Sequence, residues 1–251
     1  VIQIDMNLQR KSVTDVVTDV HAHGCQIVGL SPSAFTIRTA QKLVSQLRKR
    51  CKDIKILFGG NYTTLLGASV HEFLPSIDFA FHGQVFDSLP EVLDLVEGRR
   101  DYLPQGVTTR ESARDMSTTA ARVTTQTFPE WFKSLSYCRQ MLTASDVIPS
   151  FISSYGCSGK CTFCTEPPPF AFPAEVIRNS VSAISRVRSG RRIWNNCAEL
   201  LHTSPAFLET ALHRDDGPLD YFAMSRVEPF ANLDDEGLAS LVRGGLKAIL
   251  L

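Results

Sequence analysis

The sequence predicts an α/β protein made of two series of strands and helices, separated by a segment of poor periodicity. Three observations lead to this fold class. Short apolar runs alternate with longer segments in which apolar residues recur at helical spacing. The runs are apolar on both faces, as in parallel strands that helices cover on both sides. Gly or Ser follows several of the runs, where a strand would turn into a helix. The first series therefore predicts a doubly wound parallel sheet.

Residues 1–98 hold the first series. Its expected strands are Val1–Asp5, Gln26–Leu30, Ile54–Phe58 and Asp78–Phe81. Its expected helices carry apolar stripes within Val13–Val20, Ile37–Leu47, Leu65–Leu74 and Leu89–Val96. Ligands of such sheets bind beyond the carboxyl ends of the strands. The residues at these ends are Ser31, Gly59, Gly60 and Gly83. Glycine lets a ligand approach the backbone closely, although tight turns alone would also explain these glycines.

Residues 99–147 are expected to form a linker rich in Thr, Ser and Arg, with one helix near Trp131–Leu142. The second series covers residues 148–251. Its expected strands are Ile148–Ser154, Arg192–Asn196, Asp220–Arg226 and Lys247–Leu251. Its expected helices lie within Val176–Val187, Pro205–Leu212 and Asp234–Arg243. Because the chain opens on a strand and stops within another, we expect it to be a fragment of a longer protein.

The composition narrows the class of protein. Lys and Arg balance Asp and Glu at 26 each, so the chain lacks the basic excess that favours nucleic acid as a partner. No apolar run approaches the roughly 20 residues that span a bilayer, and no signal peptide is recognisable, so we expect a cytoplasmic protein. Seven cysteines, three of them crowded together, do not resemble a disulfide framework. Crowded cysteines in a cytosolic chain are typical of metal or redox chemistry.

The crowded cysteines are Cys157, Cys161 and Cys164, in a C-x3-C-x2-C pattern that directly follows an expected strand. Thiolates are soft ligands that suit iron–sulfur clusters and zinc. Electron-transfer 4Fe-4S clusters are usually held by four cysteines, whereas three can leave one iron open to a substrate. A structural zinc ion needs four ligands, and the remaining candidates, Cys138 and Cys197, are distant in sequence. The pattern therefore favours a 4Fe-4S cluster with an open iron.

This segment resembles the motif of the radical S-adenosylmethionine (SAM) superfamily, C-x3-C-x-aromatic-C, with Phe163 at the aromatic position. The resemblance implies an incomplete (β/α) barrel with the cluster loop after its first strand. It also implies that the open iron binds SAM, and that an electron from an external donor such as flavodoxin or ferredoxin cleaves SAM. The 5′-deoxyadenosyl radical so formed would abstract hydrogen from a small-molecule or natural-product substrate.

Later segments resemble the cobalamin-associated branch of this superfamily. The matching pieces are Tyr221–Arg226, Leu233–Leu238 and Gly244–Lys247. Arg226 stands where the branch often has an arginine at a strand end, and the alternative is a surface charge. Asn195 and Asn196 stand where the branch often has aspartate, so any role at that strand is left open.

Residues 1–98 resemble the flavodoxin-like cobalamin-binding domain of the same branch, without its first strand. The matching pieces are Val28–Ser33, Phe58–Gly60, Ile77–Phe79 and Gly83. The resemblance implies that Ser31 and Ser33 contact the nucleotide tail of cobalamin, and that Gly59, Gly60 and Gly83 make room for it. Gln84 replaces the glutamate that commonly follows the last glycine. His21 and His23 are expected on a helix rather than in a cobalt-binding loop.

Three functions follow from these patterns. The first is a cobalamin-dependent radical SAM methyltransferase acting on an unreactive carbon. The second is a radical SAM enzyme without cobalamin that forms rings, rearranges its substrate or inserts sulfur. The third is a non-catalytic electron-transfer or binding protein, which would need a fourth cluster ligand. Nothing in the sequence identifies the substrate.

Overall fold

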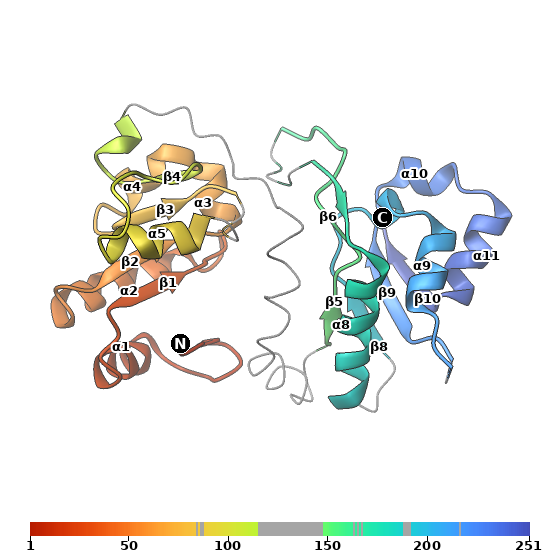
Figure 1. Ribbon diagram of the computed structural model, residues 1–251, viewed down its shortest axis with the longest axis horizontal. Helices are drawn as coiled ribbons and strands as arrows, with labels where there is room; N and C mark the ends of the chain where they lie inside the picture. Colours follow the sequence, from red (N-terminus) through yellow and green to blue (C-terminus); the bar gives the residue numbers. More distant parts are fainter. Residues whose placement is uncertain are drawn as a thin grey trace. The chain divides into compact units, whose positions relative to one another are not determined.

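The computed structural model describes residues 1–83, 85, 88–114, 148–162, 164, 166, 168–187, 192–215 and 217–251. The chain divides into two compact units, Val1–Thr127 and Phe128–Leu251. Each unit contains a sheet dominated by parallel strands and helices that connect them (Figure 1). The predicted α/β class is therefore confirmed.

The first unit is built on a four-stranded sheet. Its strands are β1 (Ile27–Leu30), β2 (Lys55–Phe58), β3 (Phe79–Phe81) and β4 (Val107–Thr108), in the order β1-β2-β3-β4. The first three are parallel, and β4 runs antiparallel to β3. Because the parallel strands point the same way, their carboxyl ends meet at one edge of the sheet, as the sequence predicted.

Helices cover both faces of this sheet. They are α1 (Val13–Ala22), α2 (Ile37–Arg50), α3 (Asn61–Leu66), α4 (Val70–Phe73) and α5 (Ser88–Val96), with 3₁₀ turns at Gly67–Ser69 and Ser112–Arg114. Ile56 and Phe58 of β2 are buried in the cluster formed with α1, α2 and α4. Leu57, between them, is buried in the opposite cluster with Val92 of α5. Because successive side chains of β2 enter apolar clusters on opposite faces of the sheet, all of its buried positions are apolar.

Two expectations for the first unit differ from the structure. Val1–Asp5 is not a strand; the sheet ends at β1, and these residues make no ladder with it. An apolar run alone cannot form a strand, because its backbone groups need a neighbouring strand to pair with. Val107–Thr108 is a strand although it lies in the expected linker, so the first unit extends past residue 98. The helix predicted near Trp131–Leu142 lies outside the described residues.

The second unit contains a four-stranded, fully parallel sheet in the order β10-β9-β8-β5. Its strands are β5 (Ser150–Phe151), β8 (Arg192–Asn195), β9 (Asp220–Met224) and β10 (Leu246–Leu250). The connecting helices are α8 (Ala174–Val187), α9 (Pro205–Leu212), α10 (Val227–Ala231) and α11 (Asp235–Arg243), with a 3₁₀ turn at Leu200–His202. Helix α9 packs against both α8 and α11, so the helices that connect these parallel strands pack beside one another.

The strand expected over Ile148–Ser154 is divided in two. Its first part is β5, and its second is β6 (Ser154–Tyr155), which pairs antiparallel with β7 (Phe170–Ala171). Ser153 lies at the break, where its N–H bonds the side chain of Asn195 rather than a neighbouring strand. The other three expected strands are found within two residues of their predicted ends. None of the helices in the described part of the chain has the length and apolar character of a membrane span.

Candidate functional site

The three crowded cysteines lie on the loop between β6 and β7 in the second unit. Cys157 is half-buried, Cys161 and Cys164 are exposed, and all three are free thiols. The N–H of Gly159 donates to Cys157 Sγ at 3.3 Å, and the N–H of Glu166 donates to Cys164 Sγ at 3.5 Å. The loop thus already directs backbone donors at two sulfurs. Phe163, the predicted aromatic residue, lies outside the described residues.

Thiolates are soft ligands, so the chemistry of this donor set suits an iron–sulfur cluster. Among the residues that the structure describes, no three His, Cys, Asp or Glu side chains lie close enough together to hold one metal ion. A multinuclear cluster distributes its thiolates over several irons, and backbone N–H groups commonly bond its sulfurs. Three accessible thiols on one short loop, with backbone donors aimed at two of them, meet those requirements.

Asn195, at the carboxyl end of β8, fixes the chain just before this loop. Its side-chain Oδ1 accepts from the N–H of Ser153 at 3.0 Å, and its Nδ2 donates to Ser153 Oγ at 2.7 Å. Both residues are completely buried. Buried polar groups are nearly always paired, so this reciprocal bond helps to hold the backbone at the break between β5 and β6. The structure thereby gives the first asparagine of the Asn195-Asn196 pair a role.

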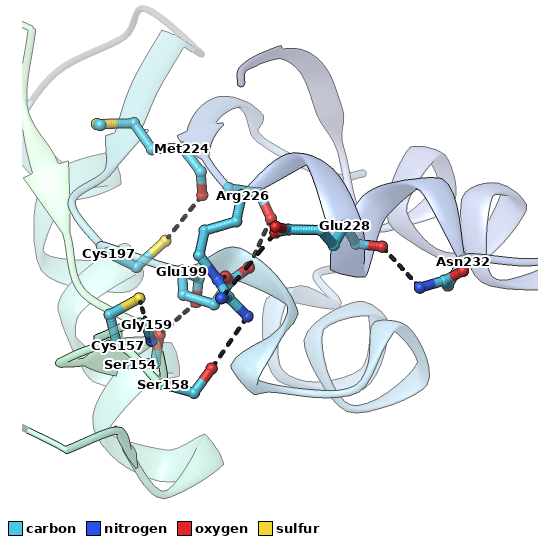
Figure 2. A network of polar contacts seen from close by, with 11 residues as sticks. Ser154, Cys157, Ser158, Gly159, Cys197, Glu199, Met224, Arg226, Glu228 and Asn232 are labelled. Carbon is cyan, nitrogen blue, oxygen red and sulfur yellow. Dashed lines mark hydrogen bonds and ion pairs between the residues drawn. The ribbon is translucent and has the colours of Figure 1, made fainter. Parts of the chain in front are cut away.

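A second network joins the loop to β9 (Figure 2). Glu199, 3% exposed, accepts from Ser225 Oγ at 2.6 Å and from Arg226 Nε at 2.7 Å. Arg226 Nη2 donates to Ser158 Oγ at 3.1 Å. The carboxylate of Glu199 raises the pKa of the Arg226 guanidinium further above its ordinary value. Sequence reasoning singled out Arg226 but missed Glu199, whose only signal is an acidic residue soon after a buried strand.

Cys197 is brought beside this network although it is 40 residues from Cys157 in the chain. Its thiol is buried and lies 3.9 Å from the carbonyl oxygen of Met224. Burial raises the pKa of this thiol to about 11. Burial therefore keeps this thiol neutral while no metal is bound.

In the first unit, the predicted residues gather at the carboxyl edge of the sheet. Gly60 has φ +92°, and a Cβ added there would lie 2.7 Å from Ser31 Oγ, so only glycine permits this close approach. Gly59 bonds the carbonyl of Leu30 through its N–H, and Gly83 donates its N–H to Thr64 Oγ1 at 2.8 Å. Ser33 is exposed and its side chain bonds that of Thr36 at 3.2 Å.

A buried polar cluster that the sequence did not reveal lies in the same unit. His71 and His82 each bond Thr108 Oγ1 at 2.9 Å through Nε2. All three side chains are buried. Desolvation lowers the pKa of both imidazoles, so they are neutral at pH 7. Through these contacts Thr108 of β4 links α4 to the residue that follows β3.

Comparison with known proteins gives a structural match without a sequence match. No protein-family model and no curated protein matches the chain. The solved structure of the cobalamin-dependent SAM radical enzyme OxsB with aqua-cobalamin and SAM bound matches with a TM-score of 0.76 at 13% identity. OxsB with aqua-cobalamin alone matches with a TM-score of 0.76 at 14% identity, and apo OxsB with 0.77 at 14%. The chain shares its fold with OxsB.

The match to OxsB covers 98% of this chain but only 38% of the OxsB chain. At this identity the likeness establishes the fold alone. OxsB is a cobalamin-dependent radical SAM enzyme, and the sequence motifs of this chain resemble the same branch.

Proposed function

We propose that this chain carries the cofactor-binding parts of a cobalamin-dependent radical SAM enzyme. One observation supports this most strongly. A three-thiol loop lies at the carboxyl edge of a parallel sheet, in a chain that shares its fold with OxsB. In this proposal the first unit is flavodoxin-like and binds cobalamin, and the second is an incomplete (β/α) barrel.

The second unit would hold a 4Fe-4S cluster through Cys157, Cys161 and Cys164. Arg226 would offer its outward N–H donors to the carboxylate of SAM, because its Nε is already committed to Glu199. Phe163 would line the cofactor pocket. When bound, the cluster and SAM would supply one electron and a carbon-centred radical able to remove hydrogen from an unreactive carbon. The protein's own task is to bind and orient these groups and to exclude water and oxygen.

The first unit would hold cobalamin through its carboxyl edge. Ser31 and Ser33 would contact the nucleotide tail, while Gly59, Gly60 and Gly83 would let it lie against the backbone. The position of these residues beyond the carboxyl ends of β1, β2 and β3 supports this proposal, because ligands of such sheets bind there. Cobalamin would carry the methyl group in a methyl transfer to a small molecule or natural product.

Two other functions compete with methyl transfer. A radical SAM cyclase, rearrangement or sulfur-insertion enzyme would use the same thiol loop without cobalamin. An electron-transfer protein would need a fourth cluster ligand in addition to the three thiols of the loop. An external electron donor such as flavodoxin or ferredoxin is part of both radical proposals.

The deciding experiment uses the full-length protein, purified and reconstituted with iron and sulfide without oxygen. Incubation with SAM and a reductant is expected to yield 5′-deoxyadenosine, and the purified protein is expected to retain added cobalamin. Cys161→Ala should lose the cluster absorption, while Cys51→Ala, in the first unit, should keep it. An intact cluster that never cleaves SAM would refute the radical function. Cleavage without cobalamin binding would favour the second function.

A further inference from the structure

Glu199 is a buried carboxylate that enters the proposed function only as the partner of Arg226 Nε. It lies four residues after the end of β8 and is 3% exposed. An ionised carboxylate in such a place is costly unless it is paired and hydrogen-bonded. Its two oxygens are paired separately, one with Ser225 Oγ and the other with Arg226 Nε. The backbone carbonyl of the same residue accepts from Ser154 Oγ at 3.1 Å, at the start of the cysteine loop.

The guanidinium of Arg226 contacts Glu199 through one nitrogen and the cysteine loop through another. Its Nε edge is bonded to Glu199, and its Nη2 reaches Ser158, between the first and second cysteines. A Cβ added at Gly159 would lie 3.7 Å from Arg226 Cδ and 3.8 Å from Arg226 Nη1. The guanidinium therefore lies over the Ser158-Gly159 turn, as Figure 2 shows. The exposed carboxylate of Glu228 lies 4.0 Å from Nη1 at the outer rim.

At Gly159 little space is left between the loop backbone and the neighbouring side chains. A Cβ there would also lie 3.3 Å from Cys157 Sγ. The turn thus has room for a backbone between the first cysteine and a guanidinium, but little room for a side chain. A small displacement of Arg226 would therefore change the surroundings of the first cysteine.

We propose that Glu199 is a positioning residue that fixes the Arg226 guanidinium over the Ser158-Gly159 turn. It thereby sets both the shape of the cysteine loop and the direction of the outward N–H donors. This inference rests on the proposed function, because those donors face SAM only if the loop carries the cluster. A carboxylate is required, since it neutralises Arg226 and accepts in line with its planar fork. An amide would keep the shape without the charge.

Three variants of the full-length, reconstituted protein test this inference. Glu199→Gln removes the charge, and Arg226→Lys keeps the charge but loses the planar fork. Glu209→Gln is the matched control, because Glu209 bonds Arg243 at 2.7 Å in the same unit but far from the loop in sequence. The measurements are iron and sulfide content, the SAM dissociation constant, and the electron paramagnetic resonance spectrum of the reduced cluster with and without SAM.

The inference predicts that Glu199→Gln and Arg226→Lys each weaken SAM binding by about 10–100-fold, the usual effect of removing a residue that orients a ligand. The SAM-induced change in the resonance spectrum should shrink in both, while the control resembles the parent. A merely structural role would lower the melting temperature without changing that spectrum. Arg226→Lys also covers the case in which Glu199→Gln does not fold.

Parent-like SAM affinity and spectra in Arg226→Lys, or in a folded Glu199→Gln, would overturn the inference. The proposed function fails in a different way. If it is wrong, the parent protein itself will hold no cluster, or its cluster spectrum will not respond to SAM. The parent therefore separates the two failures before any variant is measured.

Discussion

The reciprocal bond between Asn195 and Ser153 can be tested by truncating Asn195 to alanine. The change removes two hydrogen bonds at a site with no exposed surface. The N–H of Ser153 would be left buried without its acceptor, which costs about 1–3 kcal/mol, and the lost hydroxyl bond costs about 1 kcal/mol more. Asn195→Ala should therefore destabilise the second unit by about 2–4 kcal/mol.

Urea unfolding followed by tryptophan fluorescence measures this effect. Trp194 is next to Asn195 on β8, and changing the chain's other tryptophan, Trp131, to phenylalanine leaves it as the sole reporter. With a slope of about 1–3 kcal/mol per molar urea, the midpoint should fall by roughly 1 M or more at unchanged slope. Asn232→Ala, which removes an exposed bond to the carbonyl of Glu228, is the control and should cost less than about 0.5 kcal/mol.

The partner variant Ser153→Ala completes a double-mutant cycle. If the two side chains interact as the structure shows, the double variant should lose about 1 kcal/mol less than the sum of the single losses. A loss below about 1 kcal/mol in Asn195→Ala, or losses that add, would refute the reasoning. Either result would mean that the break between β5 and β6 does not depend on this pair.

Three further predictions concern other parts of the chain. His71 and His82 have pKa values lowered by burial from the ordinary 6.5, so the folded first unit binds fewer protons than the unfolded chain. Their contribution to stability is present above about pH 6.5 and is lost as the pH falls below it, by up to about 1.4 kcal/mol per pH unit for each imidazole. Urea midpoints that do not change between about pH 7.5 and 5.5 would contradict this. Gly60→Ala should destabilise the first unit by about 1 kcal/mol or more and weaken cobalamin retention, because φ is +92° and the new Cβ would meet Ser31 Oγ at 2.7 Å. Parent-like melting and cobalamin retention would speak against the proposed edge. Cys197→Ala should leave the iron content of the reconstituted protein unchanged, because the proposed cluster is held by Cys157, Cys161 and Cys164; loss of iron would instead make Cys197 a fourth ligand.

The sequence by itself determined the features that depend on neighbouring residues. Periodicity located α1, α2, α8 and α11, because each helix buries one stripe of its own residues. The cysteine spacing placed three thiols on one loop, because the eight residues from Cys157 to Cys164 cannot carry them far apart. Glycine and serine after buried strands marked the carboxyl edge of the first sheet. Parallel strands bring their carboxyl ends together, whatever the helices between them contain.

Only the tertiary structure decided which distant groups meet. Val1–Asp5 has the sequence pattern of a strand but pairs with no strand of the sheet. Val107–Thr108 shows little strand pattern in the sequence, yet it pairs with β3. Asn195 and Ser153 are 42 residues apart, and Arg226 and Ser158 are 68 apart. The sequence pattern indicates whether a residue is buried, but not which group forms its hydrogen bonds there. That choice depends on how the strands are placed side by side, so the bonds that shape the cysteine loop appear only once the sheet is assembled.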